Sequence, residues 1–101
     1  MGRTRPLTLR YTPRALAELS RVLSLNRDNS PESARRVGER IQAVIELLAS
    51  YPRAGQATDV PTLRKILARP YPYLIFYEAR ETEIVVIAVR HAARDPGSMP
   101  V

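Results

Sequence analysis

The sequence contains no cysteine and no tryptophan, and His91 is its only histidine. Without cysteine the chain forms no disulfide, carries no catalytic thiolate and offers no thiolate ligand for zinc. A single imidazole does not build a histidine-based metal site either. We therefore expect a protein without a metal and without a cofactor.

Long apolar runs are also missing. The longest one, Ile84 to Val89, is far shorter than the ~20 residues that a membrane-spanning helix needs. The first residues, Met1 to Pro6, lack the apolar stretch of a secretory signal peptide. The sequence therefore predicts a cytoplasmic protein with no membrane association.

Arginine is abundant instead. The 101 residues include 16 basic and 10 acidic side chains, for a net charge of +6, and Lys65 is the only lysine. Guanidinium groups bind carboxylates and phosphates through paired hydrogen bonds, so an acidic protein or a nucleic acid is the expected partner. Composition bias from a GC-rich genome explains the arginine excess equally well, because the charges form no dense run.

The hydrophobic share of 45% is typical of a globular protein. The length fits one domain over residues 1–101, with a structured core at about 7–96 and a tail at 97–101.

The first half of the chain predicts a strand followed by two helices. Leu7 to Tyr11 alternates as a strand does. Thr12-Pro13 is a helix start, since threonine caps free N–H groups and proline fits the first turn, and this helix should end near Asn26. After a break at residues 27–29, Ser30-Pro31 starts a second helix, and the short break predicts an antiparallel hairpin. The apolar stripe of this second helix is Ala34, Val37, Ile41, Val44 and Leu48.

The second half predicts strands. Tyr51 to Gly55 ends the second helix and a loop continues to Thr62. Three segments rich in branched and aromatic residues follow, namely Leu63–Ala68, Tyr73–Glu78 and Ile84–His91. The predicted fold class is therefore α+β, with a strand, an antiparallel helical hairpin and a three-stranded antiparallel sheet.

The run from Ile84 to Val89 is apolar on both faces, whereas a strand with one wet face alternates. Two helices cover one face of a small sheet, and little chain remains for the other. An incompletely covered second face would be a partner site, because exposed apolar patches mark such sites. The alternatives are that a terminal segment folds over it, or that small side chains leave little exposed.

Catalytic patterns are weak, and we assign no catalytic residue. The chain has no Ser-His-Asp arrangement, no glycine-rich phosphate loop and no suggestive group of carboxylates. The cationic and aromatic residues of the second half would suit RNA cleavage if they converged with His91 as the base. Their other interpretation is a solvated rim with a structural histidine. The residues concerned are Arg64, Lys65, Arg69, Tyr71, Arg90, His91 and Arg94.

Several motifs follow one another in a recognisable order. Tyr11–Ala15 opens a helix, Tyr51–Gly55 holds a Pro-x-x-Gly turn, and Leu63–Glu78 holds a YPY segment followed by IFY. The last strand leads into Arg90–Pro96, with a His-x-x-Arg-Asp-Pro ending. Together these motifs resemble the RelE/ParE toxin superfamily, and its ParE branch most, over about Leu7 to Pro96.

The resemblance implies a type II toxin whose helical hairpin packs on an antiparallel sheet. It also implies a ParD-like antitoxin with a DNA-binding ribbon-helix-helix part and an extended segment that wraps the toxin. DNA would then be contacted only through the antitoxin, and no small-molecule substrate is expected. The residues that we expect at the antitoxin are Leu16, Leu19, Leu23, Arg36, Arg40, Val85 and Ile87.

The superfamily has two activities. RelE-like members cleave ribosome-bound mRNA with a basic and aromatic cluster, but here Ala92 follows His91 and no tyrosine occurs after Tyr77. ParE-like members stall DNA gyrase by protein contact and need no catalytic set, so the resemblance implies a gyrase inhibitor. The expected target contacts are Arg69, Arg90, His91 and Arg94.

Three alternatives stay open: a RelE-like endonuclease, a toxin fold that has lost toxicity, and a single-strand nucleic-acid binder. The last would stack bases on Tyr71, Tyr73 and Tyr77, but the resemblance favours packing in the core or the hairpin for these tyrosines. The target residues would be structural if Arg94 pinned the tail and His91 capped the sheet edge.

Overall fold

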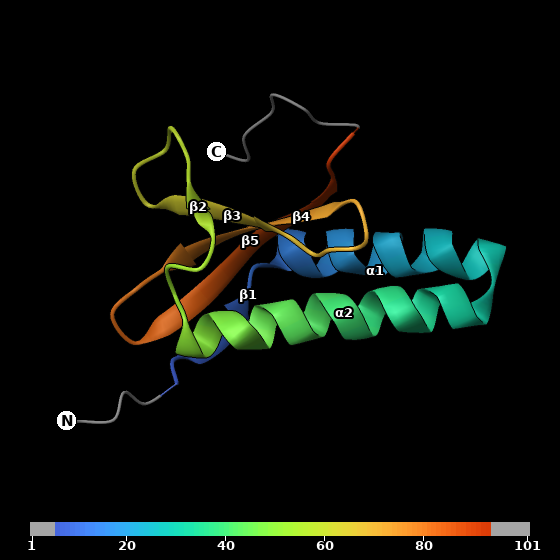
Figure 1. The fold of residues 1–101 in the computed structure, drawn as a ribbon, viewed down its shortest axis with the longest axis horizontal. Coiled ribbons are helices and arrows are strands. Elements are labelled where there is room, and N and C mark those ends of the chain that lie inside the picture. Colours follow the sequence, from blue (N-terminus) through green and yellow to red (C-terminus); the bar gives the residue numbers. More distant parts are fainter. Residues whose placement is uncertain (1–5, 94–101) are drawn as a thin grey trace.

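A computed structural model describes residues 6–93 of the chain, so Arg94 and the predicted tail lie outside the described residues. A strand and two helices come first, and four strands follow (Figure 1). The elements are β1 (Thr8–Tyr11), α1 (Pro13–Asn29), α2 (Pro31–Ser50), β2 (Gln56–Ala57), β3 (Leu63–Leu67), β4 (Tyr73–Ala79) and β5 (Glu83–His91).

The strands form one five-stranded sheet in the order β1-β5-β4-β3-β2. All neighbours are antiparallel except β1, which runs parallel to β5. The helical hairpin covers one face of this sheet (Figure 1). The predicted α+β class is confirmed, but the sheet has five strands rather than three and is mixed. The first strand joins it at one edge, and the predicted loop contributes β2, which is too short to show any alternation in sequence.

Both helices begin as predicted, but α1 ends later. The Thr12 hydroxyl oxygen accepts a hydrogen bond from Ala15 N at 3.0 Å and so caps α1. Residues 27–29, predicted as a break, are helical, and only Ser30 separates the helices. Ser30 serves both ends, because its N–H donates to Asn26 O at 3.1 Å while its Oγ accepts from Ser33 N at 3.0 Å. One residue with both capping functions replaces a three-residue break.

The main core lies between the sheet and the helices. The predicted stripe of α2 is confirmed, since Ala34, Val37, Ile41, Val44 and Leu48 are all buried. The stripe meets side chains of β4 and β5, including Ile75, Val86 and Val89. None of the helices in the described part of the chain is long and apolar enough to cross a membrane.

A β-bulge in β5 explains the run that is apolar on both faces. Tyr77 pairs with Val86 and Phe76 with Ala88, so Ile87 is the extra residue. Ile84, Val86 and Val89 pack on the helix side, whereas Ile87 joins a second cluster on the other side of the sheet. That cluster consists of Leu63, Phe76 and Ala88, with Val60, Leu74 and Ile87 packed against it.

The expectation of an open second face around Val85 is therefore wrong. Val85 is 1% exposed and offers no accessible side chain to an antitoxin. Ile87 is partly buried against the second cluster. On the same face Leu63, Phe76 and Ala88 are also buried, and Val60 from the preceding loop packs against them.

Candidate partner-binding surfaces beside helix α1

Helix α1 is much less buried than α2. Only Ala15 and Val22 are buried along its length, and Leu16 and Leu25 are 53% and 47% exposed. An open hollow lies on either side of the helix, and the two hollows hold four of the eleven side chains predicted as contacts, namely Leu19, Leu23, Arg90 and His91.

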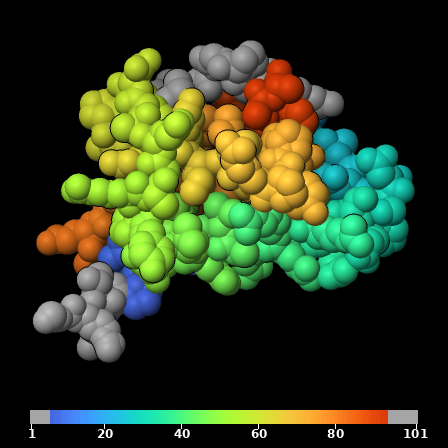
Figure 2. Space-filling model, viewed as in Figure 1, coloured from blue at the N-terminus to red at the C-terminus, as the bar shows by residue number. Residues whose placement is uncertain are grey.

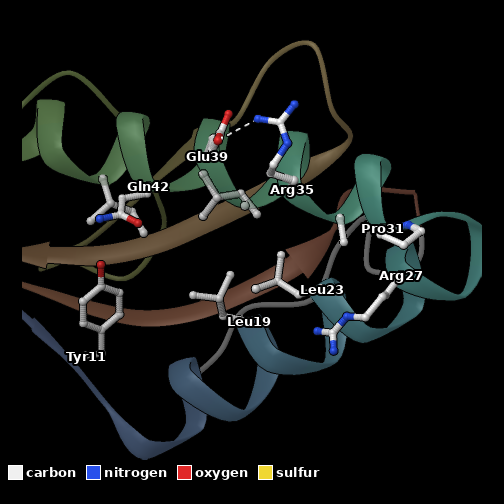
Figure 3. A pocket seen from close by; sticks show the side chains of 12 residues that line it. Tyr11, Leu19, Leu23, Arg27, Pro31, Arg35, Glu39 and Gln42 are labelled. Carbon is white, nitrogen blue, oxygen red and sulfur yellow. Dashed lines mark hydrogen bonds and ion pairs between the residues drawn. The ribbon is translucent and has the colours of Figure 1, made fainter.

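The first hollow, here called the hairpin groove, lies between α1 and α2 and measures about 470 Å³. Leu19 and Leu23 project from α1 toward α2, while Tyr11 lies at one end and Arg27 at the other (Figure 3). The side of α2 contributes Ala34, Arg35, Gly38, Glu39, Ile41, Gln42 and Ile45. The groove thus combines aliphatic side chains from both helices with charged ones.

Gly38 sets how closely the two helices approach. A Cβ atom at this position would lie 3.1 Å from Cδ2 of Leu23, which is tighter than ordinary contact. The missing side chain lets Leu23 of α1 lie against the backbone of α2. Nothing in the sequence singled out this glycine, because its role depends on the crossing of two helices.

The charges along α2 are mostly paired with one another. Arg35 bonds Glu39 at 2.9 Å and Glu32 at 2.5 Å, and Arg36 bonds Glu32 at 3.0 Å. These hydrogen bonds, with Arg35 the stronger, lower the pKa of the Glu32 carboxyl. Arg36, predicted at the antitoxin, is thus tied into an exposed ion-pair network. Arg27 carries no side-chain hydrogen bond or ion pair within residues 6–93.

The second hollow, here called the strand-end hollow, lies between α1 and the end of β5 and measures about 560 Å³. Glu18 of α1 ties the two elements together, since its Oε1 accepts a hydrogen bond from Val89 N at 2.9 Å. Asn26 donates to the Tyr73 hydroxyl at 3.0 Å, and the ring of His91 meets that of Tyr73 edge-on at 5.4 Å.

Only part of the predicted target cluster meets here. Arg90 and His91 both line the strand-end hollow, and Arg90 Nε lies 3.8 Å from Glu18 Oε2. Arg69 lies elsewhere, exposed in the turn between β3 and β4, where its carbonyl accepts from Arg40 Nε at 2.5 Å. Arg40, predicted at the antitoxin, thus anchors that turn to α2. Arg94 lies outside the described residues.

The three tyrosines pack in the protein, as the resemblance implied, and do not form the base-stacking platform of the nucleic-acid alternative. Tyr77 is 0% exposed, and Tyr71 and Tyr73 pack against the main core. Nor do the cations of β3 converge with His91, since Arg64 donates to Gly55 O at 2.7 Å. Sequence reasoning missed Glu18, because an acidic residue on a helix shows no sign that a strand will end beside it.

Two features limit the chemistry of these hollows. His91 Nδ1 accepts the Ala93 N–H at 3.1 Å, so this ring nitrogen is occupied. Within residues 6–93 no group of three or more acidic or histidine side chains is placed to hold a metal ion. Apolar contact and ion pairing are therefore the interactions that the hollows offer best.

Residues 9–96 match the family described as the ParE toxin of the type II toxin–antitoxin system parDE. The chain belongs to the ParE toxin family. A relative from Caulobacter vibrioides named Toxin RelE2 is 34% identical over 84 residues, which cover 83% of this chain and 93% of the relative. The predicted membership of the RelE/ParE superfamily of type II toxins is thereby confirmed.

Solved structures of this superfamily share the fold of the ParE-family chain. A chain from the chromosomal ParDE system of P. aeruginosa superposes with a TM-score of 0.75 at 20% identity, covering 87% of this chain and 98% of that one. A mutant of the E. coli toxin RelE, in complex with an antitoxin RelB peptide, gives a TM-score of 0.58 at 21% identity, covering 96% and 99%.

Proposed function

We propose that this ParE-family toxin acts in the cytoplasm by protein–protein contact with DNA gyrase, and that a ParD-like antitoxin neutralises it by occupying the hairpin groove. The observation that carries the proposal is the open groove between α1 and α2, with Leu19 and Leu23 projecting into it. Both solved relatives above come from toxin–antitoxin systems, which supports an antitoxin as the occupant.

The groove fits an amphipathic helix of the antitoxin. Such helices lay apolar side chains, spaced three or four residues apart, into a hydrophobic groove. Leu19 and Leu23 are themselves one turn apart, so apolar side chains with the same spacing on a partner helix can pack against them. Arg27 at the end of the groove favours an acidic residue on the incoming helix. The toxin's net charge of +6 also favours an acidic partner.

A titration of the purified antitoxin against toxin variants tests this docking site. Leu19→Arg fills the groove with charge and should weaken antitoxin binding by at least ~10-fold, the scale of losing one interface anchor. Ala17→Arg places the same charge on an exposed position of α1 outside the groove and should leave binding unchanged. Equal affinity of Leu19→Arg and the unchanged toxin would refute the groove as the docking site.

The contact mechanism is supported by how the possible catalytic groups are used. General acid–base catalysis of RNA cleavage needs positioned side chains around the scissile phosphate, each worth ~10²–10⁴-fold. Here Arg64 is bonded to a loop carbonyl and Tyr77 is buried. Neither side chain is therefore free to act on a scissile phosphate, which favours protein contact over RNA cleavage.

Gyrase supercoiling of relaxed plasmid tests the target. The purified toxin should abolish supercoiling or cause cleaved plasmid to accumulate, and added antitoxin should reverse the effect. Undisturbed gyrase at a large excess of toxin would remove this enzyme as the target.

One observation favours a second function. The relative from Caulobacter vibrioides carries the name RelE2, and RelE-like toxins cleave ribosome-bound mRNA. Primer extension on mRNA from cells that express the toxin would show cleavage within translated codons under that function. A toxin fold without activity predicts that expression changes neither supercoiling nor mRNA.

A further inference from the structure

An apolar patch at the C-terminal end of α2 lies outside both hollows. Leu47 and Tyr51, one helical turn apart, are 45% and 63% exposed. They border an open depression of about 620 Å³ that is completed by Ser50, Pro52, Arg53 and Ala54. Figure 2 shows this end of α2 and the loop after it, in lime green, at the surface of the molecule. We call it the helix-end patch.

The patch rests on a loop that the sheet holds in place. The buried Tyr77 hydroxyl donates to Pro52 O at 2.8 Å and accepts from Gly55 N at 2.9 Å. Arg64 adds a bond to Gly55 O at 2.7 Å, and Ala54 N donates to the carbonyl of Tyr51 at 3.0 Å. Because the loop is already ordered, little conformational entropy would be lost when a partner docks.

Gly55 keeps the loop close to the sheet. A Cβ atom there would lie 2.7 Å from Lys65 O and 2.7 Å from the Tyr77 hydroxyl, so the backbone approaches too closely for any side chain. The patch is thus held by a buried tyrosine and a glycine, while its own tyrosine points to solvent.

The patch has the composition of an interface centre. Tyrosine and arginine are enriched at the residues that dominate binding energy, and the exposed Leu47 beside them adds apolar surface. Arg53 is exposed and has no side-chain hydrogen bond or ion pair within the described residues. An unpaired guanidinium beside apolar side chains complements a surface that presents an apolar side chain next to a carboxylate.

We propose that the helix-end patch, with Leu47, Tyr51 and Arg53, is a contact surface for the protein that the toxin attacks, and that this target presents an apolar anchor beside an acidic residue. The inference rests on the proposed function and places part of its target contact away from the strand-end hollow.

Two other occupants fit less well. A second copy of the chain would approach through a two-fold axis, which brings the same patch, and hence the two Arg53 side chains, together. Like charges at the centre of a contact between molecules of net charge +6 oppose that pairing. The antitoxin is proposed for the hairpin groove, whose lining on α2 ends at Ile45, before the patch begins.

Binding to the assembled gyrase holoenzyme tests the inference, with the full-length toxin immobilised. Tyr51→Ala should weaken binding about 30-fold, the scale of truncating a dominant aromatic. Arg53→Glu should weaken it by reversing the charge. Ala17→Glu is the control for an added negative charge, because Ala17 is exposed on α1, lines neither hollow and should bind like the unchanged toxin.

The outcomes separate the two proposals. If the unchanged toxin binds gyrase, and Tyr51→Ala and Arg53→Glu bind equally well, the helix-end patch is excluded and the proposed function stands. If the unchanged toxin neither binds nor inhibits gyrase, the proposed function fails and this inference fails with it. Both variants should keep their antitoxin binding and their melting temperatures while they lose gyrase binding. If gyrase binding is lost only because the variants unfold, the inference is overturned.

Discussion

The two helices of the hairpin lie side by side on one sheet, yet they are buried to different degrees. Helix α2 buries seven residues, from Ala34 to Ala49, whereas α1 buries only Ala15 and Val22. The two helices are nearly equal in length, at 20 and 17 residues, so length does not explain the difference. Helix α1 has an open hollow on each side instead.

The difference in burial assigns different roles to the two helices: α2 mainly stabilises the fold, and α1 mainly offers side chains for binding. Buried aliphatic side chains of α2 supply the hydrophobic stabilisation, at roughly 25 cal/mol per Å² of apolar surface. Half-exposed leucines of α1 contribute less to folding and remain available to a partner. The comparison therefore predicts that substitutions in α2 reduce stability, while substitutions in α1 reduce binding.

The largest expected effect is in the core of α2. Ile45 is 0% exposed, and Ile45→Ala should lower the free energy of unfolding by ~2–5 kcal/mol, since a cavity adds to the lost transfer energy. Leu16→Ala on α1 should change it by less than ~0.5 kcal/mol, because Leu16 is exposed. Urea unfolding of both variants measures the contrast. An equal loss of unfolding free energy in the two variants would contradict the different roles of the two helices.

The next effect concerns the loop at the end of α2. Tyr77→Phe leaves the Gly55 N–H and the Pro52 carbonyl without their bonds, which should cost ~1–3 kcal/mol in the free energy of unfolding. Hydrogen exchange should accelerate at the Gly55 amide first. Tyr73→Phe is the control, since its hydroxyl bonds a side chain beside the partly open strand-end hollow. An unchanged exchange rate at Gly55 would contradict the anchoring role of Tyr77.

A smaller change in stability should accompany a large change in binding at Leu23. Its side chain is partly buried and contacts the groove beside Gly38, so Leu23→Ala should cost ~1 kcal/mol, below the range for fully buried leucines. Antitoxin affinity should fall at least ~10-fold. Calorimetric titration and thermal melting on one preparation give both values. A stability loss of the size expected for Ile45→Ala would place Leu23 in the core instead.

The smallest effect appears only at alkaline pH. Burial raises the pKa of the Tyr77 hydroxyl above its ordinary value of 10.0, against smaller lowering effects of Gly55 and Arg64. The unfolded chain therefore loses this proton first and holds fewer protons than the folded chain, so stability falls as pH rises above ~10. Melting temperatures from pH ~8 to ~11 should fall less steeply for Tyr77→Phe. If the melting temperature fell equally with pH in the unchanged toxin and in Tyr77→Phe, the loss of stability would not come from Tyr77.

Local signals predicted the helices and the long strands well. The stripe of α2 and the starts at Thr12 and Ser30 depend on neighbours within one or two turns, so the sequence shows them directly. The parallel pairing of β1 with β5 joins residues more than 70 positions apart, such as Thr8 and Glu83. Such pairing depends on how the whole hairpin crosses the sheet, and no local pattern encodes it.

The candidate sites were harder to predict for the same reason. Leu19 and Leu23 were assigned to the antitoxin, and both line the hairpin groove. Val85 was assigned there too, but the strands and their side chains bury it. Glu18 and Gly38 escaped notice because each matters only through a contact with another element.

The bulge at Ile87 changes which residues of β5 face the helices in the part of the strand that follows it. Before it, even-numbered residues such as Ile84 and Val86 face the helices; after it, the odd-numbered Val89 and His91 do. If β5 had no bulge and Ile87 paired with Phe76, Arg90 would lie opposite Tyr73 and His91 would turn to the other face of the sheet. The position of the only imidazole in this toxin is thus decided by a single inserted amino acid four residues upstream.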